Sequence, residues 1–401
     1  MIFTTLLAAA APALASGGNT GVSLMVHAEY LHVGPGEVVR NALVQVDEGQ
    51  IVAVLPGRSA PDGALSVHSA HAGMIDASAR TTQAPSAVEQ SKEIITQLSV
   101  QDAIDPFDPA WDRLARTGVT TALICPPDLN VIGGLSVVVK TAGAPRLEGR
   151  VLDGKPILRG AIGDQPSGGN SPAFGRPRDY FARRPTTRMG VEWEWRKAFF
   201  DAGQAERFPE ADFEGADVLR ACLKGDVRVM IQAWTTADIR TACYIDEEMQ
   251  REGYGDLDLV IDAGAEAWRE PAFLQRTGTP VVLPPFPTSG RSGERSFMPW
   301  NTARVLKDKG IEIALSCHGE TGPNARLGDQ AGYAMRGGLT FDEALAAVTT
   351  TPAALLGVDQ RVGKVAAGMD ADLVLWNGTP FAATSAIVGV VAGGEVVLQP
   401  R

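Results

Sequence analysis

The chain has 401 residues, of which 45% are hydrophobic and 21% are charged, so it can bury a core large enough for an α/β barrel with a small second unit. With 36 Lys and Arg against 47 Asp and Glu, its formal net charge is −11. This acidic balance argues against a nucleic acid or an anionic membrane surface as a partner.

Residues 1–15 (MIFTTLLAAAAPALA) form an uncharged apolar run that ends in small residues, Ala13 and Ala15, ahead of Ser16. This pattern predicts a secretory signal peptide and export to the periplasm. The run has no Lys or Arg before it, so a disordered or wrongly assigned start is the alternative. It is too short to span a bilayer, and no other segment predicts a membrane span.

Short strand-like runs occupy both ends of the chain. Near the N-terminus, Asp47-Glu48-Gly49 separates two apolar runs, which is a hairpin signal, and Asn377-Gly378 marks a turn near the C-terminus. We therefore expect residues 22–72 and 360–401 to form one small composite β-sandwich. The runs are 22–33, 43–46, 51–55, 372–376, 387–391 and 395–398.

The middle of the chain, residues 73–359, alternates continuous apolar runs with helical stretches. Such runs suit strands that are buried on both faces of a parallel sheet, and helices are expected at 216–224 and 237–252. This alternation predicts a (β/α)₈ barrel, whose chemistry takes place at the C-terminal ends of the strands. The runs are 120–124, 227–231, 257–261, 280–283 and 311–315.

Two stretches rich in Gly, Pro and Ser, 163–177 and 284–299, interrupt this alternation. They are expected to be loops that cover the barrel mouth, with ordinary surface loops as the alternative. The pair Gly133-Gly134 predicts a tight turn, since it lacks the spacing of a dinucleotide-binding loop.

Six stretches, in this order, resemble the amidohydrolase superfamily, in particular its imidazolonepropionase-like branch: GMID at 73–76, ARTGVTT at 115–121, NVIGGLSVVVKTAG at 130–143, PTTRMG at 185–190, PAALLG at 352–357 and VGKVAAGMDADLVLW at 362–376. The resemblance implies a distorted TIM barrel with a composite β-sandwich. It also implies hydrolysis with zinc or another divalent metal, bound by histidines and an aspartate at the strand ends.

The histidines do not fit such a metal site. Four of the five lie in the first 71 residues, and His318 alone lies beyond them. A hydroxyl is a poor zinc ligand and a guanidinium cannot ligate at all, so we predict that no metal or other cofactor is bound. The positions at which the resemblance places metal ligands are Ser78, Arg80, Gln232, Trp234, Ala263 and His318, the last in place of the family's aspartate.

The remaining candidates for active residues are Asp164, Asp262, His318 and Lys140. We expect Arg80 to pair with Asp164 or Asp262 and to replace the charge of the metal, with a solvent-facing Arg80 as the alternative. Lys140 is a candidate because some members of the superfamily use a carboxylated lysine, although a structural or substrate-contacting role is the simpler interpretation.

The four cysteines show no C-x-x-C pair and are expected to be buried thiols, with a Cys222–Cys243 disulfide left open. Cys317 and His318 could form a thiolate–imidazole pair, but adjacent residues of a strand point to opposite faces.

These observations favour a catalytically inactive member of the family, a pseudoenzyme that is a partner or regulatory subunit of a homo- or hetero-oligomer. An active amidohydrolase relative is one candidate for its partner. The surviving stretches NVIGG and TRMG are expected in loops and helices, as a structural role predicts. One alternative is an active hydrolase of C–N bonds, in cyclic amides or peptide-like substrates, with an atypical site at Asp164, Asp262, Cys317, His318 and Lys140. Another is a protein that binds a small ligand without turnover.

Overall fold

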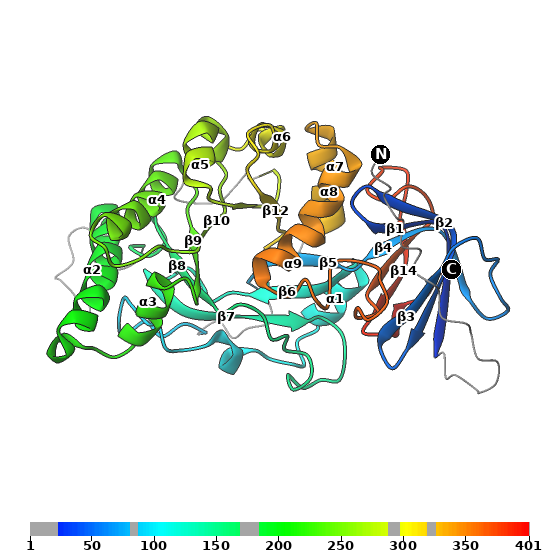
Figure 1. Cartoon of the computed structure of the whole chain (residues 1–401), viewed down its shortest axis with the longest axis horizontal. Helices are drawn as coiled ribbons and strands as arrows, with labels where there is room; N and C mark the ends of the chain where they lie inside the picture. Colours follow the sequence, from blue (N-terminus) through cyan, green and yellow to red (C-terminus); the bar gives the residue numbers. More distant parts are fainter. Residues whose placement is uncertain (1–22, 81–86, 169–183, 288–296, 319–325, 401) are drawn as a thin grey trace, which may run out of the picture.

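The computed structural model describes residues 23–80, 87–168, 184–287, 297–318 and 326–400. The predicted signal peptide lies outside these residues, as do 169–177 and 288–296 of the two predicted mouth loops. Figure 1 shows a mixed α/β molecule in which a barrel-like sheet with surrounding helices lies beside a second sheet built from both ends of the chain. None of the helices in the described ranges combines the length and the apolar character that crossing a bilayer requires.

The barrel-like sheet has eight strands in chain order. All neighbouring pairs are parallel except those of β7, which is antiparallel to both β6 and β8. The sheet nearly closes between its edges, where the backbone N–H of Arg80 donates to the carbonyl of His318 (3.2 Å). The expected barrel is therefore confirmed as a barrel-like sheet, with one reversed strand and without the helices that a (β/α)₈ alternation requires between β6 and β8. The strands are β5 Met74–Ala79, β6 Val119–Ile124, β7 Ile132–Lys140, β8 Ile157–Ala161, β9 Arg228–Gln232, β10 Leu259–Asp262, β11 Val281–Leu283 and β12 Ile313–Leu315.

The prediction that Gly133-Gly134 forms a tight turn, and that NVIGG lies in a loop or helix, is wrong. Both glycines lie in β7, where the register with β8 shifts between Ile132 and Gly134. A Cβ atom on Gly134 would lie 2.5 Å from the carbonyl oxygen of Leu98, and the next N–H, of Leu135, donates to that oxygen. The glycine pair therefore makes a bulge that lets the 95–98 segment approach the strand.

The barrel interior is filled by apolar side chains from successive strands, among them Leu123, Met230, Val260 and Val282. Because the interior is closely packed, polar groups collect at the ends of the strands. A larger apolar cluster lies between the sheet and the surrounding helices.

The helices have local stop and start signals in the sequence. Thr235 and Thr340 begin α4 and α8 with capping boxes, which satisfy the first free N–H groups of each helix. The predicted helices at 216–224 and 237–252 are α3 and α4. The helices are α1 Ala110–Arg116, α2 Arg188–Arg207, α3 Ala216–Leu223, α4 Thr236–Arg251, α5 Pro271–Thr277, α6 Thr302–Lys307, α7 Leu327–Arg336, α8 Phe341–Val348 and α9 Thr350–Leu356, with short 3₁₀ segments η1 Val100–Ala103, η2 Pro209–Ala211 and η3 Ala267–Arg269.

The second sheet combines both ends of the chain, as expected. Its order is β15-β14-β13-β4-β1-β2-β3, so β13 pairs with β4 across some 300 residues of sequence (Figure 1). The described residues form one continuous seven-stranded sheet, and the two-sheet sandwich is not confirmed. The domain boundaries remain predictions. The strands are β1 Leu24–Gly34, β2 Glu37–Asp47, β3 Gln50–Leu55, β4 Leu65–Ala72, β13 Leu373–Trp376, β14 Ile387–Ala392 and β15 Glu395–Leu398.

Two glycine turns hold the ends of the chain together. Gly49, with φ of +81°, closes the predicted hairpin between β2 and β3, and Gly394, with φ of +82°, closes that between β14 and β15. A Cβ atom on Gly394 would lie 2.6 Å from the Cα of Gly49. Only glycine permits both this backbone conformation and this close approach.

Candidate functional site at the end of the barrel

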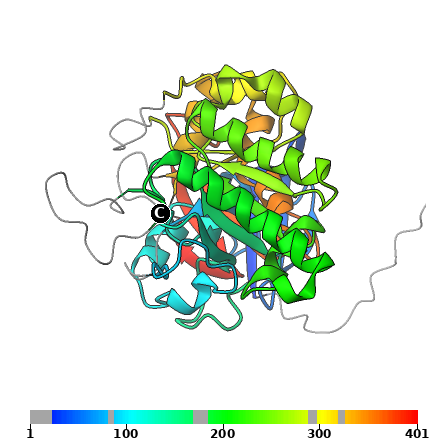
Figure 2. The ribbon, with the colours of Figure 1, turned by 90° about the vertical axis from the view of Figure 1, so that its left-hand side faces the viewer.

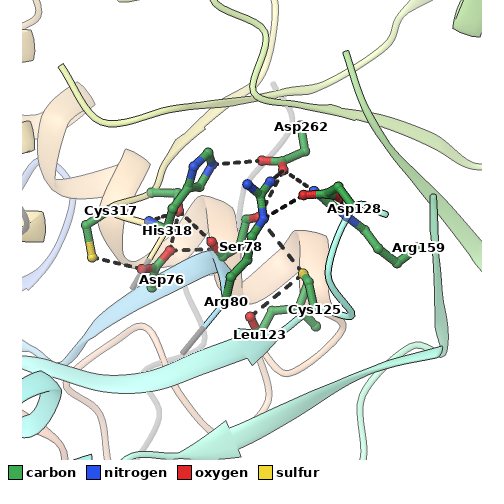
Figure 3. Close-up of polar contacts among 11 residues, drawn as sticks. Asp76, Ser78, Arg80, Leu123, Cys125, Asp128, Arg159, Asp262, Cys317 and His318 are labelled. Carbon is green, nitrogen blue, oxygen red and sulfur yellow. Dashed lines mark hydrogen bonds and ion pairs between the residues drawn. The ribbon is translucent and has the colours of Figure 1, made fainter. Parts of the chain in front are cut away.

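Asp262 is the centre of a buried polar cluster where the barrel strands end. It is the last residue of β10, and its side chain is fully buried. Its Oδ2 atom accepts hydrogen bonds from Ser78 (3.0 Å), Arg80 (3.0 Å) and Arg159 (2.6 Å). Figure 3 shows the three donors around the carboxylate: Ser78 lies on β5, Arg80 directly follows β5, and Arg159 lies on β8. Three donors, two of them cationic, therefore share one oxygen atom.

A second carboxylate, Asp128, completes the cluster from the segment after β6. Its Oδ2 lies 2.8 Å from Nε of Arg80, and its Oδ1 accepts from Nε of Arg159 at 2.9 Å. Each arginine therefore bridges the same two aspartates (Figure 3). The side chains of Asp128 and Arg159 are each 1% exposed and that of Arg80 is 16% exposed. Two guanidinium groups balance two carboxylates, so these four side chains carry no net charge.

The ionisation of Asp262 is fixed by its cationic neighbours. Burial alone would raise its pKa, but Arg159, His318 and Arg80 outweigh burial and hold the pKa well below its usual range. For Arg159, burial would lower the pKa, but Asp128 and Asp262 raise it instead. Both residues are therefore charged at neutral pH, as bridging ion pairs in a low-dielectric interior require.

His318 and Gln232 lie beside Asp262. Nε2 of His318 is 3.5 Å from Oδ1 of Asp262, and the imidazole meets the ring of Trp234 edge to face. Gln232 ends β9 and is in register with Asp262 on β10, so the two side chains share a face of the sheet. The Gln232 side chain is fully buried, and within the described part of the chain neither atom of its amide has a hydrogen-bond partner.

A third carboxylate, Asp76 on β5, binds the other side of the last barrel strand. The thiol of Cys317 donates to Oδ2 of Asp76 at 2.9 Å, and the hydroxyl of Ser316 donates to its Oδ1. Cys317 thus faces Asp76, whereas the ring of His318 faces Asp262 (Figure 3). The two adjacent side chains point in different directions; both residues lie beyond the end of β12, and the φ of +53° at His318 is not that of a strand.

The structure brings together Ser78, Arg80, Gln232, Asp262 and His318 from the residues singled out in the sequence. Of the two carboxylates expected for Arg80, the observed ion pair is with Asp262. Ala263 follows Asp262 with φ of +58°, and His318 has φ of +53°. Left-handed conformations of residues other than glycine are uncommon and concentrate at specialised sites.

Two other candidates lie in different surroundings. Asp164 follows β8, is partly exposed, and accepts a hydrogen bond from Arg188 at 2.8 Å. Lys140 binds Asp370 (3.1 Å) and Asp372. Because β7 is reversed, Lys140 pairs with Thr121 near the start of β6, at the opposite end of the barrel from Asp262. Lys140 therefore links the barrel to the strand β13 region of the second sheet.

All four cysteines are buried and none is in a disulfide, so Cys222 and Cys243 are not joined. The other four histidines, His27, His32, His68 and His71, lie on β1 and β4 of the second sheet.

Three residues of the cluster were missed in the sequence: Arg159, Asp128 and Asp76. Arg159 did leave a signal, because it interrupts the apolar run ILRGA of a strand buried on both faces. A permanently charged residue in such a strand requires a buried carboxylate as partner. Asp128 follows two prolines, in a segment without any periodic pattern.

The residues present do not fit a metal ion. Within the described ranges, no three His, Cys, Asp or Glu side chains are grouped in a way that could hold one. The best-placed carboxylate, Asp262, already has three donors on Oδ2, and a dication there would lie next to two guanidinium groups. A metal dication and these guanidinium groups carry like charges and would repel each other strongly in a buried site.

Known proteins resemble this chain along most of its length. A family model described as "Amidohydrolase family" matches residues 319–398. The amidohydrolase tasK of Hapsidospora irregularis is 28% identical over a match of 386 residues, and the match covers 87% of this chain and 37% of that protein. The imidazolonepropionase of Shewanella amazonensis is 45% identical over a match of 67 residues, which covers 15% of this chain and 16% of that protein. The chain thus spans little more than a third of the length of the first relative and less of the second.

Among solved structures, an amidohydrolase from Thermotoga maritima MSB8 matches with a TM-score of 0.79 and 25% identity, covering 94% of this chain and all of that one. An adenosine deaminase from Xanthomonas campestris with bound zinc has the same fold, with a TM-score of 0.53, 17% identity and 94% and 93% of the two chains covered. The fold and these matches define the barrel architecture of the amidohydrolases as the class to which this structure is similar. The family model, the tasK match and the Thermotoga maritima structure together support the amidohydrolase superfamily for this chain.

Proposed function

We propose that this protein keeps the amidohydrolase barrel without metal-dependent hydrolysis and acts as a non-catalytic partner or regulatory subunit. The observation that carries the proposal is the set of three donors on Oδ2 of Asp262, two of them from Arg80 and Arg159. A guanidinium has no lone pair for a metal and keeps its charge at any physiological pH. In this proposal no metal or other cofactor is bound.

The charge balance of the cluster supports a structural role for Arg80. Buried carboxylates at a strand end need positive charge close by. Here Arg80 and Arg159 supply it to Asp128 and Asp262. In our proposal Arg80 neutralises the charge of Asp262, as a metal ion would. Unlike a metal ion, Arg80 does not activate water.

The partner is proposed from the length of the first relative. The matched region covers 37% of the tasK protein, so that protein has room outside the match for a second unit at least as large as this chain. Binding to an active relative or to a second copy of itself would give a protein with an inactive barrel a function for which selection preserves its fold. The signal-like residues 1–15 support export of this assembly, which we also propose.

Hydrolysis assays test the proposal directly. The purified chain, with and without added zinc or manganese, would be given a cyclic amide and a set of dipeptides, beside Asp262→Asn as the matched variant. We expect rates equal to those of buffer for both proteins under all conditions. Turnover that requires the metal and is lost in Asp262→Asn would overturn the proposal.

A metal-independent hydrolase of C–N bonds is a second candidate, because His318 lies 3.5 Å from Asp262. A carboxylate that orients an imidazole is the arrangement of a general base. The 3% exposure of His318 counts against it, since a substrate must reach the ring. Turnover that persists in the presence of a chelator and is lost in His318→Gln would favour this candidate.

A further inference from the structure

A second cleft lies outside the barrel end, along helix α2. It has a volume of about 570 Å³, which is within the range of roughly 300–1,000 Å³ for small-molecule sites. Figure 2 views the end of the molecule that carries α2. One wall is a single face of this helix, and the other wall comes from residues 92–97 and 213–214; the helix residues are Glu194, Lys197, Ala198, Asp201 and Gln204.

The two lysines of the cleft already have acidic partners. Lys92 binds Glu214 across the mouth of the cleft at 2.8 Å, and both side chains are well exposed. Lys197 binds Asp201 one turn further along α2. In each of these exposed ion pairs the lysine is already neutralised by an acidic side chain. The two lysines therefore do not favour an anionic ligand.

Glu194 differs from the other charged residues of the cleft. It is 8% exposed, and among the described residues no hydrogen bond or ion pair reaches its carboxylate. Arg184, a cation that acts on Glu194, is itself bound to Glu93 at 3.4 Å. Burial, and then the charge of Glu93, raises the pKa of Glu194. Burying a carboxylate without a partner costs folding free energy. The carboxylate of Glu194 lines a cavity that is large enough to admit a cationic ligand as its partner.

The apolar part of the cleft lies close to this carboxylate. Ile94, Ala198 and Phe213 line it, and Phe213 is 37% exposed. Gln204 also lines the cleft and donates its amide N–H to the hydroxyl of Tyr254, and its side-chain carbonyl oxygen is a hydrogen-bond acceptor by type. The cleft therefore combines one acidic group in need of a cation, an acceptor and an apolar surface.

We propose that this cleft binds a small organic amine, whose ammonium group pairs with Glu194 and whose apolar body packs against Ile94, Ala198 and Phe213. The negative charge of Glu194, which has no ion-pair partner among the described residues, favours a cation, and the volume of the cleft favours a small molecule. The inference is independent of the barrel end, and it holds or fails whether or not the protein hydrolyses a substrate.

Calorimetry with matched probes tests this site. The probes are 2-phenylethylamine and hexylamine, with 2-phenylethanol and 3-phenylpropionate as the uncharged and anionic analogues. We expect at least one amine to bind, and both analogues to bind at least about tenfold more weakly, a loss of roughly 1.4 kcal/mol. If neither amine binds at 10 mM, or if an analogue binds equally well, the proposal is overturned.

Variants separate the role of Glu194 from a general effect on α2. Glu194→Gln should weaken amine binding at least tenfold, and Phe213→Ala on the rim should also weaken it. The control is Glu192→Gln, on the same helix but bound to Arg196, which should bind within twofold of the parent chain. Thermal melts establish that each variant is folded. Equal amine binding by folded Glu194→Gln and Glu192→Gln would refute the assignment.

Discussion

The replacement of Arg159 by methionine is the most informative perturbation of the barrel end. The guanidinium is 1% exposed and binds both Asp128 and Asp262. Its loss leaves two buried carboxylates with Arg80 as their shared cation. Breaking a buried ion pair by removing one partner typically costs about 3–5 kcal/mol. We therefore expect the free energy of unfolding to fall by that amount in Arg159→Met.

Urea unfolding, followed by tryptophan fluorescence and circular dichroism, measures this loss. Asp262→Asn and the double variant complete a thermodynamic cycle, in which we expect a coupling energy of at least about 1 kcal/mol because the residues share one network. Arg116→Met is the matched control: its ion pair with Asp112 is exposed and should contribute less than about 1 kcal/mol. A loss in Arg159→Met no greater than in the control, together with additivity in the cycle, would refute the account of the cluster.

Three further predictions follow from the described contacts. The pKa of Asp262 is depressed in the fold, so its ionised form stabilises the protein above about pH 4, and this contribution is lost as the pH falls further. Urea titrations from pH 6 to pH 2 should therefore show a smaller change in the free energy of unfolding for Asp262→Asn than for the parent chain. Equal changes in the two proteins would contradict this. Gln232→Met should leave the melting temperature unchanged or raise it, since a buried amide without partners costs about 1–3 kcal/mol; a clear decrease would show that the amide has a partner. Burial raises the pKa of Cys243 to about 11 and also raises that of Cys222. Thiol titration at pH 8 should therefore find neither cysteine reactive in the native protein and all four cysteines reactive in guanidinium. Two fewer reactive thiols in guanidinium would indicate a disulfide.

Continuous apolar runs predicted the barrel strands well, because a strand covered on both faces has no polar alternation to disguise it. The runs at 120–124 and 311–315 correspond to β6 and β12. The reversed strand β7 could not be predicted in this way. Its glycine pair has the composition of a turn, and the reason for it, the approach of the 95–98 segment, depends on a contact that is distant in sequence.

The link between an apolar run and the end of its strand also explains which site residues could be predicted. Gln232 and Asp262 could be assigned to strand ends because they directly follow the apolar runs 227–231 and 257–261. Ser78 was placed at a strand end through the family resemblance. Lys140 was grouped with them on the resemblance alone, and the reversal of β7 places it at the opposite end of the barrel. Arg159 needed a different argument, in which a charge inside an apolar strand implies a buried counter-charge.

Metal stoichiometry, measured by elemental analysis on protein purified without an affinity tag or chelator, tests the central claim most directly. The account predicts much less than one ion per chain, with no increase after incubation with zinc or manganese followed by gel filtration. It also predicts no shift in melting temperature on adding either metal. One or two tightly held ions per chain, lost in Asp262→Asn, would contradict the claim that ion pairs have replaced a metal at the end of the barrel.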